Sequence, residues 1–132
     1  MKRFLALWLP VLVWMGMIFI GSSIGKVPQV GDEILDGLAH RAAHLLEFAV
    51  LGALLLRATS QGKPASKREI VITLLAIGLY GASDEFHQRF TPGRSSDGST
   101  VLFDVAGGAL GVWAWRWRMS TNGKRIDESV NQ

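Results

Sequence analysis

The sequence predicts an all-α fold, a bundle of four transmembrane helices with both termini in the cytoplasm. Hydrophobic residues make up 48% of the 132 residues and the mean hydropathy is +0.24, which is high for a soluble domain that carries 19% charge. These apolar residues form four blocks, and the charged residues collect in the short segments between the blocks. We therefore expect residues 1–119 to form one membrane domain and residues 120–132 to form a polar, disordered cytoplasmic tail.

The first apolar block covers residues 4–20 and follows Lys2 and Arg3. A secretory signal peptide carries the same charge pattern. However, this block is longer than a usual signal core, Pro10 interrupts it, and three more apolar blocks follow. We therefore expect a spanning helix that is retained in the protein.

The other three blocks cover about residues 38–56, 70–88 and 101–117. Each is long enough to cross ~30 Å of hydrocarbon only when its polar end is included. The fourth block contains glycines that allow a neighbouring helix to approach closely, namely Gly107, Gly108 and Gly111.

The charged residues predict the orientation of the helices. Lysine and arginine are concentrated before the first block, in residues 57–68 and after the fourth block, whereas residues 24–36 are acidic. The positive-inside rule then places both termini in the cytoplasm. The net charge of +3 does not indicate nucleic-acid binding, because the cations do not form one patch interleaved with aromatic residues. With no cysteine, the chain has neither disulfides nor thiolate ligands or nucleophiles.

Polar residues gather at the predicted outer ends of all four helices. Residues three or four apart share a helix face, and a rise of about 1.5 Å per residue places the polar faces of the second and third helices at similar depth. The cluster comprises Ser22 and Ser23 at the end of the first helix, His40, His44 and Glu47 in the second, Asp84, Glu85, His87 and Gln88 in the third, and Asp104 in the fourth.

Ionisable groups at membrane depth are costly, so this cluster predicts a functional site. We expect His44 and Glu47 to lie within contact or one-water reach of residues 84–88, because unpaired groups at that depth would cost several kcal/mol each. The alternative is a structural role, in which the polar groups pair with one another and hold the bundle together at about 0.6 kcal/mol each.

These residues resemble the pattern of the VanZ-like family of small bacterial membrane proteins. The matching features are Ser22 or Ser23, His44-x-x-Glu47, Asp84-Glu85-x-His87-Gln88, Pro92-Gly93-Arg94-Ser95 and Asp104-x-x-Gly107, over about residues 8–115. One position departs from the pattern: many members have an aspartate six residues after the arginine, where this chain has Thr100, so either Asp97 substitutes for it spatially or that role is lost. The resemblance implies a multi-pass protein of the bacterial cytoplasmic (inner) membrane with a role in the cell envelope, since the family's namesake is associated with resistance to the glycopeptide antibiotic teicoplanin.

Three functions fit such a site. The first is an enzyme acting on an envelope lipid or a lipid-linked phosphate, in which Arg94 clamps the anionic headgroup and a carboxylate and an imidazole supply acid and base. Residues 92–100 also match part of a motif of undecaprenyl-diphosphate phosphatases. The expected catalytic residues are His44, Glu47, Asp84, Glu85 and His87, and the expected substrate-binding residues are Ser22, Ser23, Gln88, Arg94, Ser95 and Asp104.

The second function is a site for zinc or another divalent ion, since the histidines and carboxylates are suitable ligands. We rank it below a site without cofactor, because Gln88 and Arg94 do not suit a cation. The third is a protein without enzymatic activity that binds an envelope lipid or an amphiphilic glycopeptide, or that organises partners, and an oligomer is compatible with this size.

Overall fold

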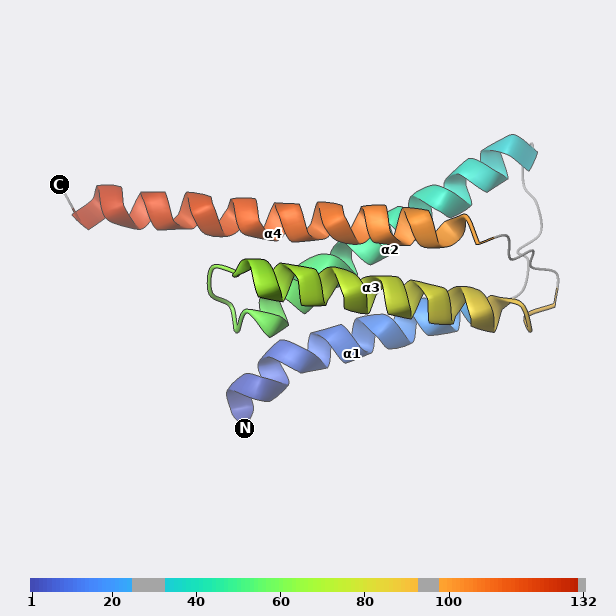
Figure 1. Cartoon of the computed structure of the whole chain (residues 1–132), viewed down its shortest axis with the longest axis horizontal. Helices are drawn as coiled ribbons and strands as arrows, with labels where there is room; N and C mark the ends of the chain where they lie inside the picture. Colours follow the sequence, from blue (N-terminus) through green and yellow to red (C-terminus); the bar gives the residue numbers. More distant parts are fainter. Residues whose placement is uncertain (25–32, 93–97, 131–132) are drawn as a thin grey trace.

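The computed structural model describes residues 1–24, 33–92 and 98–130, which contain four helices and no strand (Figure 1). The helices are α1 (Lys2–Ser23), α2 (Glu33–Thr59), α3 (Lys67–Gln88) and α4 (Thr100–Val130). The predicted all-α class is therefore confirmed. Among the described residues, Lys2–Ser23, Leu35–Thr59 and Lys67–Gln88 are long and apolar enough to cross a membrane. Helix α4 is longer but less apolar, because Asp104 lies in its first half and charged and polar residues dominate its sequence from Arg116 onward.

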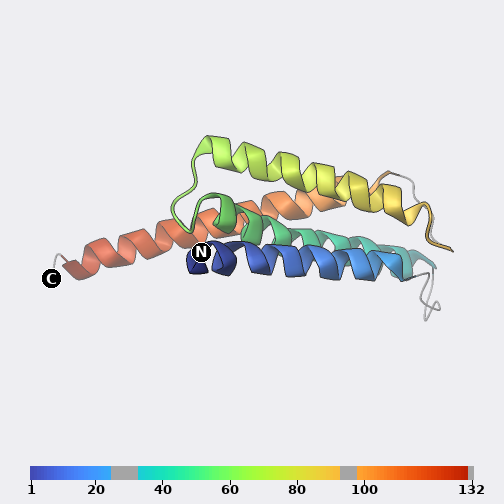
Figure 2. The same ribbon diagram turned by 90° about the horizontal axis from the view of Figure 1, so that it is seen from below.

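The helices alternate in direction, so that α1 and α3 run one way and α2 and α4 run the other (Figures 1 and 2). We call the end where α1 and α3 finish the polar end, and the opposite end, where α1 begins and α2 finishes, the basic end. At the basic end the guanidinium of Arg3 donates to the carbonyl oxygen of Gln61 at 3.0 Å. The beginning of α1 and the end of α4 both lie toward this end, which agrees with the predicted location of the two termini on one side of the membrane (Figure 1). That this side is the cytoplasm, and that α4 crosses the membrane, remain predictions.

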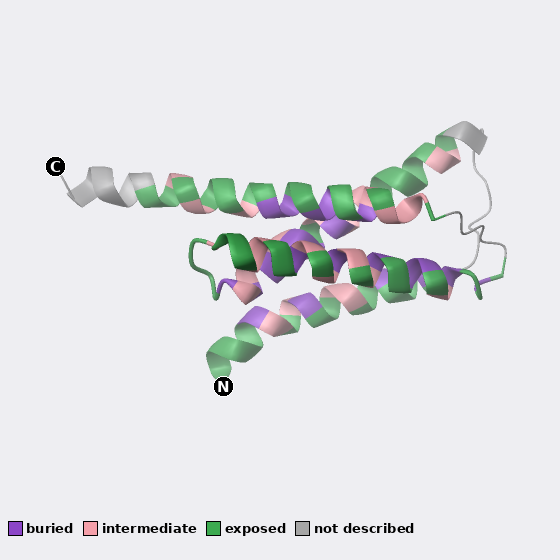
Figure 3. Ribbon diagram, viewed as in Figure 1, coloured by how far each residue is buried: buried purple, intermediate pink, exposed green. Residues whose placement is uncertain are grey.

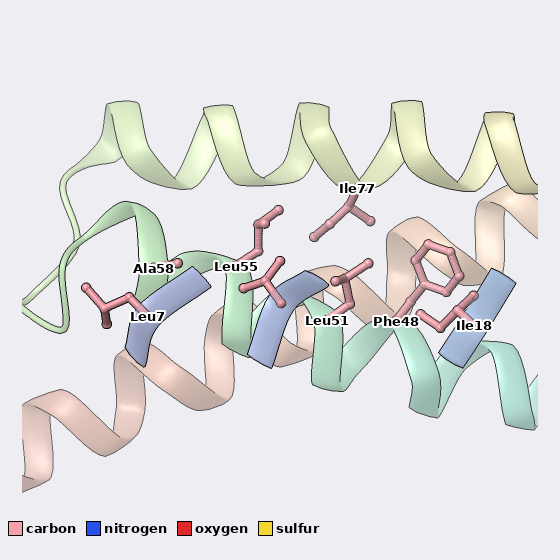
Figure 4. Packing of buried hydrophobic residues seen from close by; sticks show 8 residues of the cluster. Leu7, Ile18, Phe48, Leu51, Leu55, Ala58 and Ile77 are labelled. Carbon is pink, nitrogen blue, oxygen red and sulfur yellow. The ribbon is translucent and has the colours of Figure 1, made fainter. Parts of the chain in front are cut away.

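The hydrophobic core lies between α1, α2 and α3 and is built by Leu7, Val11, Ile18, Phe48, Leu51, Leu55, Ala58 and Ile77 (Figure 4). Most of the outward surface of the helices is exposed (Figure 3). Large apolar side chains such as Leu79 and Leu102 are more than two-thirds exposed, at 74% and 72%. A soluble protein would bury many of these groups, whereas a bilayer solvates them.

Helices α2 and α4 make the closest contact in the bundle. A Cβ atom on Gly111 would overlap the carbonyl oxygen of Ala49, and one on Gly107 would overlap that of Leu45. Gly108 in turn lies against Gly52 of α2. The close approach predicted for the glycines of the fourth block is therefore confirmed, and it brings the first turns of α4 against α2.

Helix α1 is bound to its neighbours through backbone carbonyl groups. Pro10 has no N–H group, so the carbonyl of Ala6 lacks its helical donor, and Arg57 of α2 donates to it at 3.4 Å. Further along, the indole N–H of Trp14 donates to the carbonyl of Glu47 at 2.8 Å. The hydroxyl of Tyr80 donates to the carbonyl of Met15 at 2.6 Å. These bonds fix α1 against both α2 and α3.

Helix α4 extends further than the predicted fourth block. It continues to Val130, into residues 120–132, whose assignment as a disordered cytoplasmic tail stays a prediction. Arginine, methionine and lysine have high helix propensity, and a helix already formed by packing needs no new nucleus to extend. The domain boundary at residue 119 remains a prediction.

Candidate functional site

The polar end contains a buried carboxylate, Asp84, which is only 3% exposed. Its Oδ2 atom accepts two hydrogen bonds, from the hydroxyl of Ser22 at 2.7 Å and from the side-chain amide of Gln88 at 2.8 Å. Gln88 is four residues after Asp84, so both project from the same face of α3. The other oxygen of Asp84, Oδ1, is buried and has no hydrogen-bond partner within the described part of the chain. Among the described residues, therefore, one oxygen of this carboxylate is hydrogen-bonded and the other is not.

A second buried pair connects α2 with α4. The Nδ1 atom of His44 lies 2.9 Å from Oδ1 of Asp104, and the two residues are 3% and 1% exposed. Because the carboxylate accepts, Nδ1 carries the hydrogen, which leaves Nε2 as the basic nitrogen of the ring. The other oxygen of Asp104 lies against α3, where a Cβ on Gly81 would be 2.8 Å away. The absence of a side chain at Gly81 thus makes room for this carboxylate.

The two serines at the end of α1 have different partners. Whereas Ser22 binds Asp84, the hydroxyl of Ser23 donates to the carbonyl of Phe19 at 2.7 Å and lies 3.0 Å from Nε2 of His87. A hydroxyl has one hydrogen, so with that hydrogen on Phe19 the ring N–H of His87 is the donor to Ser23. In this arrangement the hydroxyl of Ser23 contacts both the Phe19 carbonyl and the ring of His87.

A cavity of about 130 Å³ lies between the end of α1 and the start of α2. It is lined by Gly21, Ser22, His40, Ala43, His44 and Glu47. Ser22 belongs to the Asp84 group and His44 to the Asp104 group, so the two groups share this cavity. Near them, the carboxylate of Glu85 is 5% exposed and accepts from the backbone N–H of Gly98 at 3.0 Å, which ties the chain before α4 to α3.

The structure therefore brings most of the predicted site residues to one end of the bundle. They are Ser22, Ser23, His44, Glu47, Asp84, Glu85, His87, Gln88 and Asp104. The partner of His44 is Asp104, and a bridge by one water from His44 to residues 84–88 remains a prediction. Arg94 and Ser95 lie outside the described residues.

Two further residues belong to the site although the polar pattern did not select them. Gly81 lies one turn before Asp84, and the Asp104 carboxylate packs against it. A small residue one turn before a buried acid was the feature of the sequence that could have indicated this contact. The ring of Phe19 stacks on that of His87, with centroids 4.4 Å apart. Because Phe19 is apolar, a search for polar residues could not select it.

No three histidine or acidic side chains converge on a common point in the part of the chain that the structure describes. The hypothesis of a divalent metal site therefore gains no support from these residues.

Comparisons with known proteins give one result that bears on identity. The model of the family described as VanZ/LLP1 matches residues 7–119. No curated protein and no solved structure matches the chain. The matched region includes α2 and α3, most of α1, the first part of α4 and every residue of the buried polar groups described above. The chain belongs to the VanZ/LLP1 family.

Proposed function

We propose that this protein, placed in the bacterial cytoplasmic membrane, binds the headgroup of an envelope amphiphile at the polar end of its bundle. The candidate ligands are an envelope lipid, a lipid-linked phosphate or an amphiphilic glycopeptide. The observation that carries the proposal is the half-satisfied carboxylate of Asp84. Its Oδ2 atom accepts from Ser22 and Gln88, while its buried Oδ1 atom has no partner among the described residues.

A buried acceptor without a donor costs about 1–3 kcal/mol, and more when it is charged. A ligand hydroxyl, amide or ammonium group would remove that cost. Ser22, which binds Asp84, also lines the 130 Å³ cavity, so a headgroup entering there meets the same cluster. Lipid-linked envelope precursors and glycopeptides carry hydroxyl and amide donors of this kind. Arg94, which lies outside the described residues, is our candidate for binding a phosphate of the same headgroup.

The His44–Asp104 pair favours a second function, in which the bound molecule is also processed. The carboxylate of Asp104 lies 2.9 Å from Nδ1 of His44, so it holds the N–H there and fixes the orientation of the ring. His44 borders the cavity, so its Nε2 is our candidate for general base, with Asp104 as the positioning residue. Glu47 lines the same cavity and is our candidate for the acid.

The competing interpretation is structural. Ser22–Asp84 joins α1 to α3 and His44–Asp104 joins α2 to α4, and such bonds stabilise membrane bundles without any ligand. Ligand binding and bundle stabilisation differ in what they require of Asp84. A structural role needs only an acceptor for Ser22 and Gln88, whereas ligand binding needs the second oxygen as well.

The substitution Asp84→Asn separates these interpretations. The single amide oxygen of asparagine can still accept from Ser22 and Gln88, but the second position now carries an N–H donor in place of an acceptor. We would express the variant in a deletion strain and measure its membrane abundance, the lipid and peptidoglycan-precursor profile, and teicoplanin susceptibility. Glu69→Gln, an acid-to-amide change at the basic end, is the matched control.

Normal abundance of the Asp84→Asn protein with a deletion-like profile is the expected result, and the Glu69→Gln strain should resemble wild type. Purified protein should also be stabilised against heat by undecaprenyl phosphate or by teicoplanin, and Asp84→Asn should remove that stabilisation. A wild-type profile for Asp84→Asn together with loss of protein in Asp84→Ala would leave the structural interpretation in place and refute the ligand site.

A further inference from the structure

A second and larger cavity lies at the basic end, away from the site proposed above. Its volume is about 320 Å³, and it lies between the beginning of α1 and the end of α2. The residues that matter for its chemistry are Arg3, Phe4, Leu7 and Trp8 of α1 and Thr59 and Gln61 at the end of α2. None of its lining residues is acidic.

The guanidinium of Arg3 is held at the edge of this cavity. Its Nη2 atom donates to the carbonyl oxygen of Gln61 at 3.0 Å, so the side chain bridges the two helices. The backbone at Gln61 and Gly62 has positive φ angles of 54° and 72°, which turn the chain away from α2 directly after its last helical turn. A guanidinium has five N–H donors in a planar fork, and one contact with Gln61 leaves donors that match the oxygens of a phosphate.

The wall next to this cation is apolar and aromatic. The rings of Phe4 and Trp8 lie one turn apart on α1, with centroids 6.1 Å apart and planes tilted by 32°. Phe4 is 63% exposed, and the buried Leu7 also lines the cavity. A small soluble anion would contact Arg3 and leave the aromatic wall uncovered. An anion that carries an acyl chain would contact both.

We propose that this cavity binds an anionic phospholipid, with its phosphate at Arg3 and an acyl chain along Phe4 and Trp8. Charge complementarity supports this occupant, because Lys2, Arg57 and Lys63 lie close in sequence to the lining residues and add to the positive potential. Basic pockets between transmembrane helices are a recurring type of site for acidic headgroups. The proposal concerns the leaflet at the basic end and is independent of the ligand proposed for Asp84.

The test uses the purified full chain in detergent micelles and compares phosphatidylglycerol with phosphatidylcholine of the same acyl chains, by native mass spectrometry or by ligand-dependent thermal stabilisation. Inorganic phosphate alone forms a third arm, which separates a lipid site from a general anion site. Arg3→Gln is the test variant, and Arg68→Gln is the matched control, because Arg68 is exposed at the start of α3 and does not line the cavity.

We expect phosphatidylglycerol to bind at least about fivefold more tightly than phosphatidylcholine, the preference that one favourable cation supports. Arg3→Gln should remove this preference and Arg68→Gln should keep it. Trp8→Ala should weaken the binding of both lipids, because it removes part of the aromatic wall that contacts the acyl chain. This variant tests the proposal even when the Arg3→Gln protein does not accumulate. Equal affinities for the two lipids, an unchanged preference in Arg3→Gln, or displacement of the lipid by inorganic phosphate at comparable concentration would each overturn the proposal.

Discussion

Replacing Gly111 by alanine is expected to separate α2 from α4. The new Cβ would overlap the carbonyl oxygen of Ala49 and would lie 2.9 Å from the backbone nitrogen of Ala53. Both are backbone atoms, so no change of rotamer relieves the overlap. The helices must therefore move apart until these contacts approach the usual separation of about 3.5–4.0 Å.

The required movement is on the order of an ångström, and overpacking of this kind costs about 1–3 kcal/mol, or roughly 5- to 150-fold in the folding equilibrium. The effect should extend to the site. Asp104 lies about two turns from Gly111, and its hydrogen bond to His44 is 2.9 Å long, so a separation of about 1 Å would exceed hydrogen-bonding distance.

The assay is reversible unfolding of the purified protein in mixed micelles, compared with Gly16→Ala. A Cβ on Gly16 would have no neighbour within 4 Å, so this control adds the same methyl group inside a transmembrane helix without a clash. We expect the control to be as stable as wild type or slightly more stable, since alanine favours helix over glycine. Wild-type stability of Gly111→Ala, or equal destabilisation by both variants, would refute the packing mechanism.

Three further predictions concern topology, the link between α1 and α3, and the cation outside the described residues. A reporter fused after Gln132 should be active only in the cytoplasm, and periplasmic activity would overturn the predicted orientation. Tyr80→Phe should lower bundle stability by about 0.6 kcal/mol by removing the bond to the Met15 carbonyl, and no measurable change would mean that water replaces it. Arg94→Lys should impair function as much as Arg94→Ala at normal membrane abundance, because an ammonium lacks the planar fork; full activity would exclude a headgroup clamp.

The helices and the common location of the polar groups could be predicted because both depend on averaged properties. Four apolar blocks and the distribution of lysine and arginine define spans and directions, and counting residues from each end then gives the depth of a side chain. His44 and Asp84 could be assigned to one end of the bundle in this way. The extension of α4 to Val130 could not be predicted in this way, because residues 120–130 are too polar to resemble a membrane span. These residues continue a helix whose earlier turns are already packed.

The pairing of individual side chains could not be predicted, since it depends on rotation about the helix axes. Successive residues point about 100° apart, so the neighbours Ser22 and Ser23 bind different partners, Asp84 and His87. From the sequence alone, either serine could have been the partner of Asp84 or of His87. His44 pairs with Asp104 because the α2–α4 contact is close, and that closeness depends on glycine contacts across two helices, such as the fit of Gly107 against Leu45.

The proline in α1 has a consequence for how the protein is assembled. During synthesis α1 emerges first, and the carbonyl of Ala6 that Pro10 leaves without a helical donor has no protein partner until Arg57, at the far end of α2, has been made. Ala6 lies near the beginning of α1 and its contact with Arg57 is exposed, so water at the surface of the bilayer can donate to this carbonyl until α2 has been made. The contact with Arg57 then forms only after both helices are complete, and it joins the beginning of α1 to the last turn of α2.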